Sequence, residues 1–240
     1  MRKLLFILTL LIAYIGQAQD QYYHTLLLRA KPGQLLELID QLKEKARSNT
    51  ASAGDTYILR HSQGDHWDLM VIYPIESTEE YFRNYLGVKR NRTQTVSGPF
   101  GSEWFDLISF QEEAFVQGPS LEDFEAVFGP SSLFHIEIFT SLPGMQLKLL
   151  EEREMENDYL INIDRKPNLI FTRLFGPRWD QFTIGGYQDM HDFAGPPVSL
   201  EEEDKAAKDA GFEGVNYIGS YLRSLISNHN DTLAKKVSLE

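Results

Sequence analysis

The chain contains two copies of one short pattern, and this duplication constrains its fold more than any other feature. The first copy reads HTLLLRAKPGQLLEL over residues 24–38, and the second reads HIEIFTSLPGMQLKL over residues 135–149. At one constant offset the opening histidine, the Pro-Gly pair and two leucines recur. Each copy predicts a strand, a turn and an amphipathic helix, because proline suits the first turn of a helix and the leucines follow at helical spacing. A long period that occurs twice indicates a duplicated domain rather than a solenoid.

The elements expected around each copy follow the same order. The first half predicts strand, helix, two hairpin strands, a helical region and a final strand, which is the split β-α-β order of a ferredoxin-like unit. Its expected elements are a strand at 22–30, a helix from 35, strands at 56–62 and 66–73, helices from 77 and at 102–112, and a short strand at 114–117. The second half predicts strands at 133–140, 168–175, 178–184 and 232–237, helices at 144–157, 187–193 and 200–211, and a helical face from Ile218 to His229.

The predicted fold class is therefore α+β, with two tandem ferredoxin-like repeats packed sheet to sheet. Such packing buries one face of each sheet between the two and the other face under its own helices. The expected boundaries are 20–118 for the first repeat, 119–130 for a linker with a short helix, and 131–240 for the second repeat.

The N-terminal residues predict an export signal. Arg2 and Lys3 precede an apolar run over 4–15, and small or polar residues end it at 16–18. This layout is typical of a cleavable secretory signal, here 1–19, and the apolar run is short for a membrane span. We expect a periplasmic or secreted protein that leaves the membrane after cleavage. The alternative is an uncleaved N-terminal anchor. The chain has no cysteine, which excludes the lipid-anchored variant, disulfides and thiolate metal sites.

Charge and motifs exclude several functions. The formal net charge is −12, with no basic tract, so nucleic acid and anionic membranes are poor candidate partners. The sequence has no G-x-S-x-G nucleophile elbow, phosphate loop or Rossmann fingerprint. It has no H-E-x-x-H or other close-spaced ligand pattern, so we expect no structural metal site. Aromatic residues make up 12% of the chain, which indicates a well-filled core or an apolar pocket.

The duplicated topology, the Pro-Gly after each first strand and the Gly-x-x-Trp-Asp sequence of each hairpin resemble the dimeric α/β-barrel superfamily of ferredoxin-like domains. That group includes antibiotic-biosynthesis-type monooxygenases, EthD-like and NIPSNAP-like proteins. The resemblance implies a monomer that forms by internal pseudo-dimerisation the barrel others form from two chains. It also implies a cavity between the sheets that binds a small apolar or aromatic molecule. Some members oxidise phenolic substrates without a cofactor, and others hold haem through a histidine.

The candidate catalytic residues lie on the two equivalent first strands. His24 and His135 could each act as a general base near neutral pH or as an axial ligand. Glu137 should share a strand face with His135 and could orient it, while its counterpart in the first copy is Leu26. The alternative is that both histidines cap strand ends and hydrogen-bond across them.

Each predicted hairpin also carries an arginine, a tryptophan and an aspartate as candidate ligand-binding residues. The arginines are expected in mid-strand, where a partner or a cavity is needed, so either a structural salt bridge or anion binding is possible. The tryptophans fit core packing or ligand stacking. These residues are Arg60, Trp67 and Asp68 in the first repeat, and Arg173, Trp179 and Asp180 in the second.

Three functions are compatible with these residues. The first is an exported small-molecule-binding barrel, with cofactor-independent monooxygenase-like chemistry on an aromatic or apolar compound as one option. This prediction requires that side chains do not fill the cavity between the sheets. The second is a non-catalytic interaction or scaffold protein of the envelope. The third is haem binding through His24 or His135.

Overall fold

The computed structural model describes residues 21–48, 56–79, 81–83 and 104–239, so the expected signal segment lies outside the described residues. The elements of the first half are β1 (Gln21–Ala30), α1 (Leu35–Ser48), β2 (Tyr57–Gln63), β3 (Leu69–Ile75) and β4 (Ile108–Gly118). Helix α3 (Leu121–Phe128) joins the halves. The second half consists of β5 (Leu133–Ser141), α4 (Gln146–Asn162), β6 (Leu169–Phe175), β7 (Gln181–Tyr187), α5 (Met190–Ala194), α6 (Leu200–Asp209), a 3-10 turn (Val215–Tyr217), α7 (Ile218–Leu225) and β8 (Ile226–Lys236). None of the described helices has the length and apolar character needed to span a bilayer.

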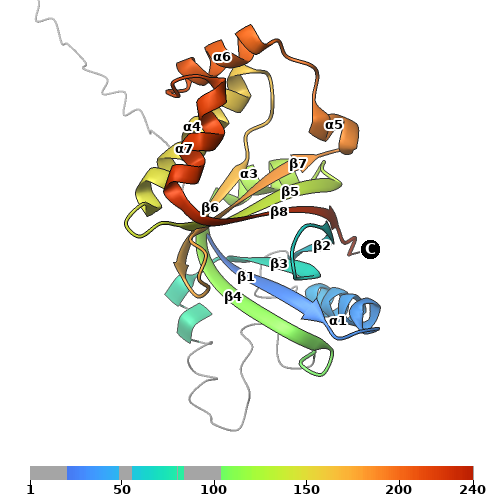
Figure 1. The fold of residues 1–240 in the computed structure, drawn as a ribbon. Coiled ribbons are helices and arrows are strands. Elements are labelled where there is room, and N and C mark those ends of the chain that lie inside the picture. The colour runs from blue at the N-terminus through green and yellow to red at the C-terminus, as the bar shows by residue number, and fades with distance from the viewer. Residues whose placement is uncertain (1–20, 49–55, 80, 84–103, 240) are drawn as a thin grey trace, which may run out of the picture.

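The eight described strands form one closed barrel in the order β1-β3-β2-β8-β5-β7-β6-β4 (Figure 1). Each repeat contributes a four-stranded antiparallel sheet, β4-β1-β3-β2 and β8-β5-β7-β6. The last strand of each repeat pairs with the second strand of the other, β8 with β2 and β4 with β6. The predicted pair of ferredoxin-like repeats is thus confirmed, and the exchange of edge pairings removes the free sheet edges.

The interior of the barrel is filled by apolar side chains. Alternate residues of a strand point to opposite faces, so Tyr23 and Leu27 of β1 point inward while Leu26 and Leu28 point outward. Aromatic rings pack closely inside, with Phe171 stacked on Phe182 at 4.4 Å between centroids. The cavity expected between the sheets is therefore occupied by core side chains in the described part of the chain, because the inward faces of both sheets carry large apolar residues.

The segment expected to be a linker closes part of this core. Ser120 caps α3 by accepting a hydrogen bond from the Asp123 amide. Phe124 and Phe128 of α3 are buried against residues of the barrel interior, with Phe124 lying 5.6 Å from Tyr23 between ring centroids. The linker helix thus belongs to the hydrophobic core.

Helices cover the outer faces of the two sheets. Leu38 and Leu42 of α1 pack on Leu26 and Leu28. On the other repeat, α4, α6 and α7 lie together over one part of the sheet, and α5 lies apart from them near the end of β7 (Figure 1). The outer face of the second sheet is therefore bordered by α4 on one side and α5 on the other.

Two expected helices, at 102–112 and from Ile218 to His229, are wrong in their C-terminal parts, which are strands. Residues 104–107 form a turn, and β4 begins at Ile108; likewise α7 ends at Leu225 and β8 begins at Ile226. β4 pairs with β1 from Gly118 back to Ile108, and β8 pairs with β5 over a similar length. Ladder hydrogen bonds with a distant strand override the local spacing of apolar residues, which had suggested helix.

Candidate functional site

Both repeats place a histidine beside a carboxylate at equivalent positions on the outer face of the barrel. His24 pairs with Phe115 across β1 and β4, and His135 pairs with Leu233 across β5 and β8. Two residues earlier on each last strand lies an acidic residue. The His24 Nε2 atom is 3.7 Å from Glu113 Oε2, and the His135 Nε2 atom is 3.1 Å from Asp231 Oδ1. The duplication therefore produced two histidine–carboxylate pairs.

The histidine of the first pair is sealed from solvent. The His24 side chain is 0% exposed, and its ring stacks on Phe115 at 4.5 Å with an interplanar angle of 3°. The Tyr81 hydroxyl lies 2.6 Å from His24 Nδ1. Burial lowers the pKa of His24, although Glu113 acts in the opposite direction. This histidine is a neutral, packed side chain at pH 7, and it lies in mid-strand rather than at the strand end expected by the capping alternative.

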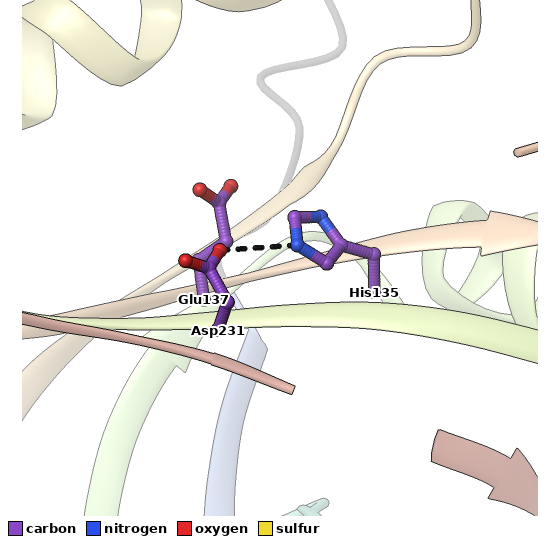
Figure 2. Close-up of side chains that lie close together, drawn as sticks. All are labelled: His135, Glu137 and Asp231. Carbon is purple, nitrogen blue, oxygen red and sulfur yellow. Dashed lines mark hydrogen bonds and ion pairs between the residues drawn. The ribbon is translucent and has the colours of Figure 1, made fainter. Parts of the chain in front are cut away.

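The pair in the second repeat is partly open and belongs to a larger polar cluster. Figure 2 shows His135, Glu137 and Asp231 converging, with the His135 ring directed toward Asp231. His229 joins them, with its Nε2 atom 3.2 Å from Glu137 Oε1 and 3.4 Å from Asp231 Oδ1. The predicted proximity of Glu137 to His135 is confirmed, because both belong to this cluster, but the direct partner of His135 is Asp231.

Two positions of the paired strands give the second site its additional polar groups. Leu26 pairs with Glu113 as Glu137 pairs with Asp231. One step further along, the residue of the last strand is Gln111 in the first repeat and His229 in the second. The second site therefore gains an acid and an imidazole where the first has an aliphatic residue and an amide.

Helix α4 adds buried charges to the second site. Arg153 Nε lies 2.6 Å from Glu152 Oε2, its Nη1 atom forms an ion pair with Glu156, and the same Nη1 lies 3.8 Å from Glu137 Oε2. Burial raises the pKa of Glu156 to about 7. Burial also works against the charged form of Glu137, but the hydrogen bond from His229 and the charge of Arg153 hold the pKa of Glu137 below its ordinary value. The cluster is therefore strongly coupled and rich in acids.

Nearby acids raise the pKa of both imidazoles of the cluster. Burial lowers the pKa of His135, but the hydrogen bond to Asp231 outweighs it together with nearby acids, and the resulting pKa lies above the ordinary value. The hydrogen bond to Glu137 raises the pKa of His229. Phe139 supports the His229 ring by stacking at 4.7 Å and 3°. Each imidazole is thus a stronger base than a free histidine, and it stands beside a carboxylate.

Aromatic residues and a glycine border the polar cluster on the α5 side. Gly185 of β7 pairs with His135, and a Cβ atom there would lie 2.9 Å from the Tyr187 hydroxyl oxygen. The Phe193 ring of α5 is 5.4 Å from the His135 ring and 5.1 Å from the Tyr187 ring. The absence of a side chain at Gly185 lets Tyr187 approach the sheet next to the cluster.

The hairpin tryptophans pack in the core, as one of the two alternatives predicted. Trp67 is 0% exposed and Trp179 is 7% exposed, and both belong to the apolar cluster of the barrel. Trp179 Nε1 also donates a hydrogen bond to Glu112 Oε1 at 2.8 Å. Neither indole lies at the polar cluster, so ligand stacking at that cluster is excluded for both.

The hairpin aspartates hold the hairpin to the first strand of each repeat. Asp68 Oδ2 accepts a hydrogen bond from the Ala30 amide at 2.8 Å, and Asp180 Oδ2 accepts from the Ser141 amide at 2.9 Å. Asp180 also forms the predicted salt bridge with Arg173 at 2.6 Å. These contacts are structural.

The expected equivalence of Arg60 and Arg173 is wrong by one residue. The His61 amide bonds to the Asp68 carbonyl as the Arg173 amide bonds to the Asp180 carbonyl, so His61 is the true counterpart of Arg173. Arg60 is exposed and forms no ion pair with Asp68 within the described residues. Because a shift of one residue reverses the face of a strand, the two arginines do not form a symmetric anion site.

The two histidines proposed as haem ligands do not fit that role as they are placed. His24 has no exposed surface, and Phe115 covers its ring. Asp231 Oδ1 lies 3.1 Å from His135 Nε2, so this imidazole could hold a haem only if Asp231 turned away.

Sequence reasoning missed His229, Asp231 and Arg153. The signal that could have found the first two is their alternation in SNHNDT, where His229 and Asp231 stand two residues apart on one strand face. Their assignment to a helix end and a loop hid this pattern.

No protein-family model and no curated protein matches the chain. Solved structures do resemble it. One is an anthrone oxidase-like protein, 11% identical over 92% of this chain and 93% of the other, with a TM-score of 0.62. A proposed chlorite dismutase is 13% identical over 92% and 96%, with a TM-score of 0.52. A proposed monooxygenase from Lactobacillus acidophilus is 8% identical over 91% and 94%, with a TM-score of 0.51. At these identities the likeness shows the fold, which is the dimeric α/β barrel in a single chain.

Proposed function

We propose that the protein binds a small, flat molecule with an ionisable hydroxyl group on the outer face of the second sheet and promotes ionisation of that hydroxyl. The observation that carries the proposal is the contrast between two equivalent sites. The first is sealed by Phe115 and Tyr81, whereas the second is partly open and carries a second acid and a second imidazole. The barrel does not need the second acid or the second imidazole for folding, since the first repeat closes the same position with apolar groups.

The chemistry of the site matches such a ligand. Each imidazole is held beside a carboxylate, so it can accept a proton from a phenol or enol in the way of a general base. Tyr187 and Phe193 border the cluster and offer aromatic surface to a flat molecule. An ionised phenol or enol is electron-rich and reactive toward dioxygen. This reactivity connects the site with the oxidase and monooxygenase names of the similar structures, and monooxygenase-like chemistry is part of the proposal.

The test is a binding screen with hydroxylated aromatic compounds, read by the absorbance shift that accompanies phenolate formation. We expect the wild-type protein to bind and ionise at least one compound, and Asp231→Asn to weaken the ionisation. Glu113→Gln changes the equivalent acid of the first repeat and is the matched control. Equal effects of the two substitutions, or no binding across the panel, would contradict the proposal.

We further propose that the protein is exported and that residues 1–19 are removed. Intact mass of the protein recovered from the periplasm or medium of an expressing bacterium tests this directly. A mass that includes Met1 to Gln19 would overturn it.

A further inference from the structure

We propose that the second repeat binds one divalent transition-metal ion through four side chains: His135, Glu137, His229 and Asp231. Donor atoms of His135, Glu137 and Asp231 all lie within 4.8 Å of one another. His229 Nε2 lies 3.2 Å from Glu137 and 3.4 Å from Asp231. The proposed metal site lies at the same cluster as the proposed ligand site, but the metal inference does not depend on the proposed function.

The spacing of the donors suits a metal ion after small movements. Histidine nitrogens and carboxylate oxygens bind zinc and similar ions at about 2.0–2.2 Å, so two ligands of one ion stand up to roughly 4 Å apart. The separations between these donors are close to that range. The Asp231 side chain is 57% exposed, so it can turn toward an ion shared with the imidazoles.

The donors come from a rigid platform. His135 and Glu137 alternate on β5, His229 and Asp231 alternate on β8, and the two strands are paired directly. A supporting shell is also in place, because Thr183 donates a hydrogen bond to Glu137 Oε2 at 3.1 Å and Phe139 stacks on His229. Such outer contacts orient metal ligands and are a regular part of metal sites.

The charge balance favours a bound cation. Four carboxylates meet at the cluster, those of Glu137, Glu152, Glu156 and Asp231, against the guanidinium of Arg153 and two imidazoles whose protons a metal ion would displace. Arg153 is held mainly by Glu152 and Glu156 of its own helix, and its contact with Glu137 is the long one at 3.8 Å. Glu137 and Asp231 therefore interact mainly with the imidazoles of His135 and His229, and imidazoles readily give up protons when they bind a metal ion. Mixed nitrogen and oxygen donors suit zinc, manganese, iron or cobalt.

The first repeat provides an internal comparison. It keeps a histidine and an acid at equivalent positions, but Leu26 and Gln111 replace the other two donors. His24 is moreover enclosed by Phe115 and Tyr81. Metal binding should therefore occur once per chain, in the second repeat.

The experiment is titration of untagged, chelator-treated protein with Co²⁺, read by visible absorption, and with Zn²⁺, read by calorimetry. We expect one ion per chain. The double substitution Glu137→Leu and His229→Gln gives the second site the composition of the first, and it should weaken binding by at least about tenfold to a hundredfold, the loss seen even for outer contacts of metal sites. Asp231→Asn, at an exposed side chain, should weaken binding without affecting folding. Glu113→Gln should leave binding unchanged.

The inference is overturned if the wild-type protein binds neither ion, or if the variants of the second site bind as tightly as the wild type while circular dichroism shows them folded. In either case the cluster is an ion-pair network. The proposed function fails separately, because the hydroxylated aromatic panel is screened both with a chelator and with added Zn²⁺. If no compound of the panel binds under either condition, the proposed function is wrong and the metal inference is unaffected. If an ion binds, it would stabilise the same oxyanion as a Lewis acid.

Discussion

Replacing Asp180 with alanine should destabilise the protein more than the equivalent change at Asp68. Asp180 Oδ2 accepts hydrogen bonds from the Ser141 amide at 2.9 Å and from the Ser141 hydroxyl at 2.7 Å, while its Oδ1 binds Arg173 at 2.6 Å. Hydrogen bonds to a charged group contribute about 1.5–3 kcal/mol each. The partly exposed Arg173 pair adds at most about 1 kcal/mol. Asp180→Ala should therefore lower the free energy of unfolding by about 4 kcal/mol.

Asp68→Ala is the matched variant in the first repeat. Asp68 accepts one hydrogen bond from the Ala30 amide at 2.8 Å, so its removal should cost about 2 kcal/mol. Urea denaturation at pH 7, followed by circular dichroism and tryptophan fluorescence, measures both values. An Asp68→Ala variant that loses as much stability as Asp180→Ala would refute the role given to Ser141 and Arg173.

The same pair of proteins gives a pH test. Burial opposes the charge of Asp180, but the Ser141 and Arg173 contacts outweigh it and hold the pKa of Asp180 below its ordinary value. The unfolded chain then binds the proton more readily, so this contribution is complete above about pH 4 and is lost as the pH falls through the lower folded pKa. The difference in stability between wild type and Asp180→Ala should narrow below about pH 4. A difference that stays constant down to pH 3 would contradict this assignment.

Three further outcomes follow from the core and from the sealed histidine. Phe171→Ala should lower the free energy of unfolding by about 3–5 kcal/mol, as for other buried phenylalanines, whereas Phe175→Ala, at a side chain that is 45% exposed, should cost clearly less in the same urea series. Gly118→Ala should be destabilising by about 1–3 kcal/mol because its Cβ would lie 2.5 Å from the Phe171 ring, and a thermal melt of unchanged midpoint would contradict this. Burial lowers the pKa of His24, so its unfolded form binds the proton more readily and stability falls as the pH drops through its ordinary value of 6.5. His24→Gln should reduce the loss of stability between pH 7 and pH 5, and an unchanged loss would show that His24 does not titrate on unfolding.

The two repeats have diverged mainly on the outer face of the barrel. Most inward-facing positions remain apolar in both, because each sheet must close the same core. On the outer face, the first repeat packs Leu26 beneath α1, while the equivalent Glu137 lies in the polar cluster beside α4. The two repeats thus share one core, while the second carries additional polar side chains on its outer face.

The repeat and the order of its elements could be read from the residues themselves, whereas the barrel was an implication of the family resemblance. Proline and glycine after each first strand, helical spacing of leucines and the matching tryptophan hairpins are local features, since they depend on backbone dihedral preferences and on the periodicity of side chains. They led correctly to two ferredoxin-like repeats. They also predicted core packing for Trp67 and Trp179, as one of two alternatives.

Only the tertiary structure decided which side of the sheet carries the polar site and which residues form it. A strand was expected only at 232–237, and the polar residues before it were not predicted as strand; they become part of β8 because β5 supplies ladder partners along them. That pairing brings Asp231 to His135, which stands 96 residues away in the sequence. Local periodicity fixes what each segment can form, whereas the pairing of distant strands fixes which side chains meet, and this depends on a free energy shared by the whole barrel.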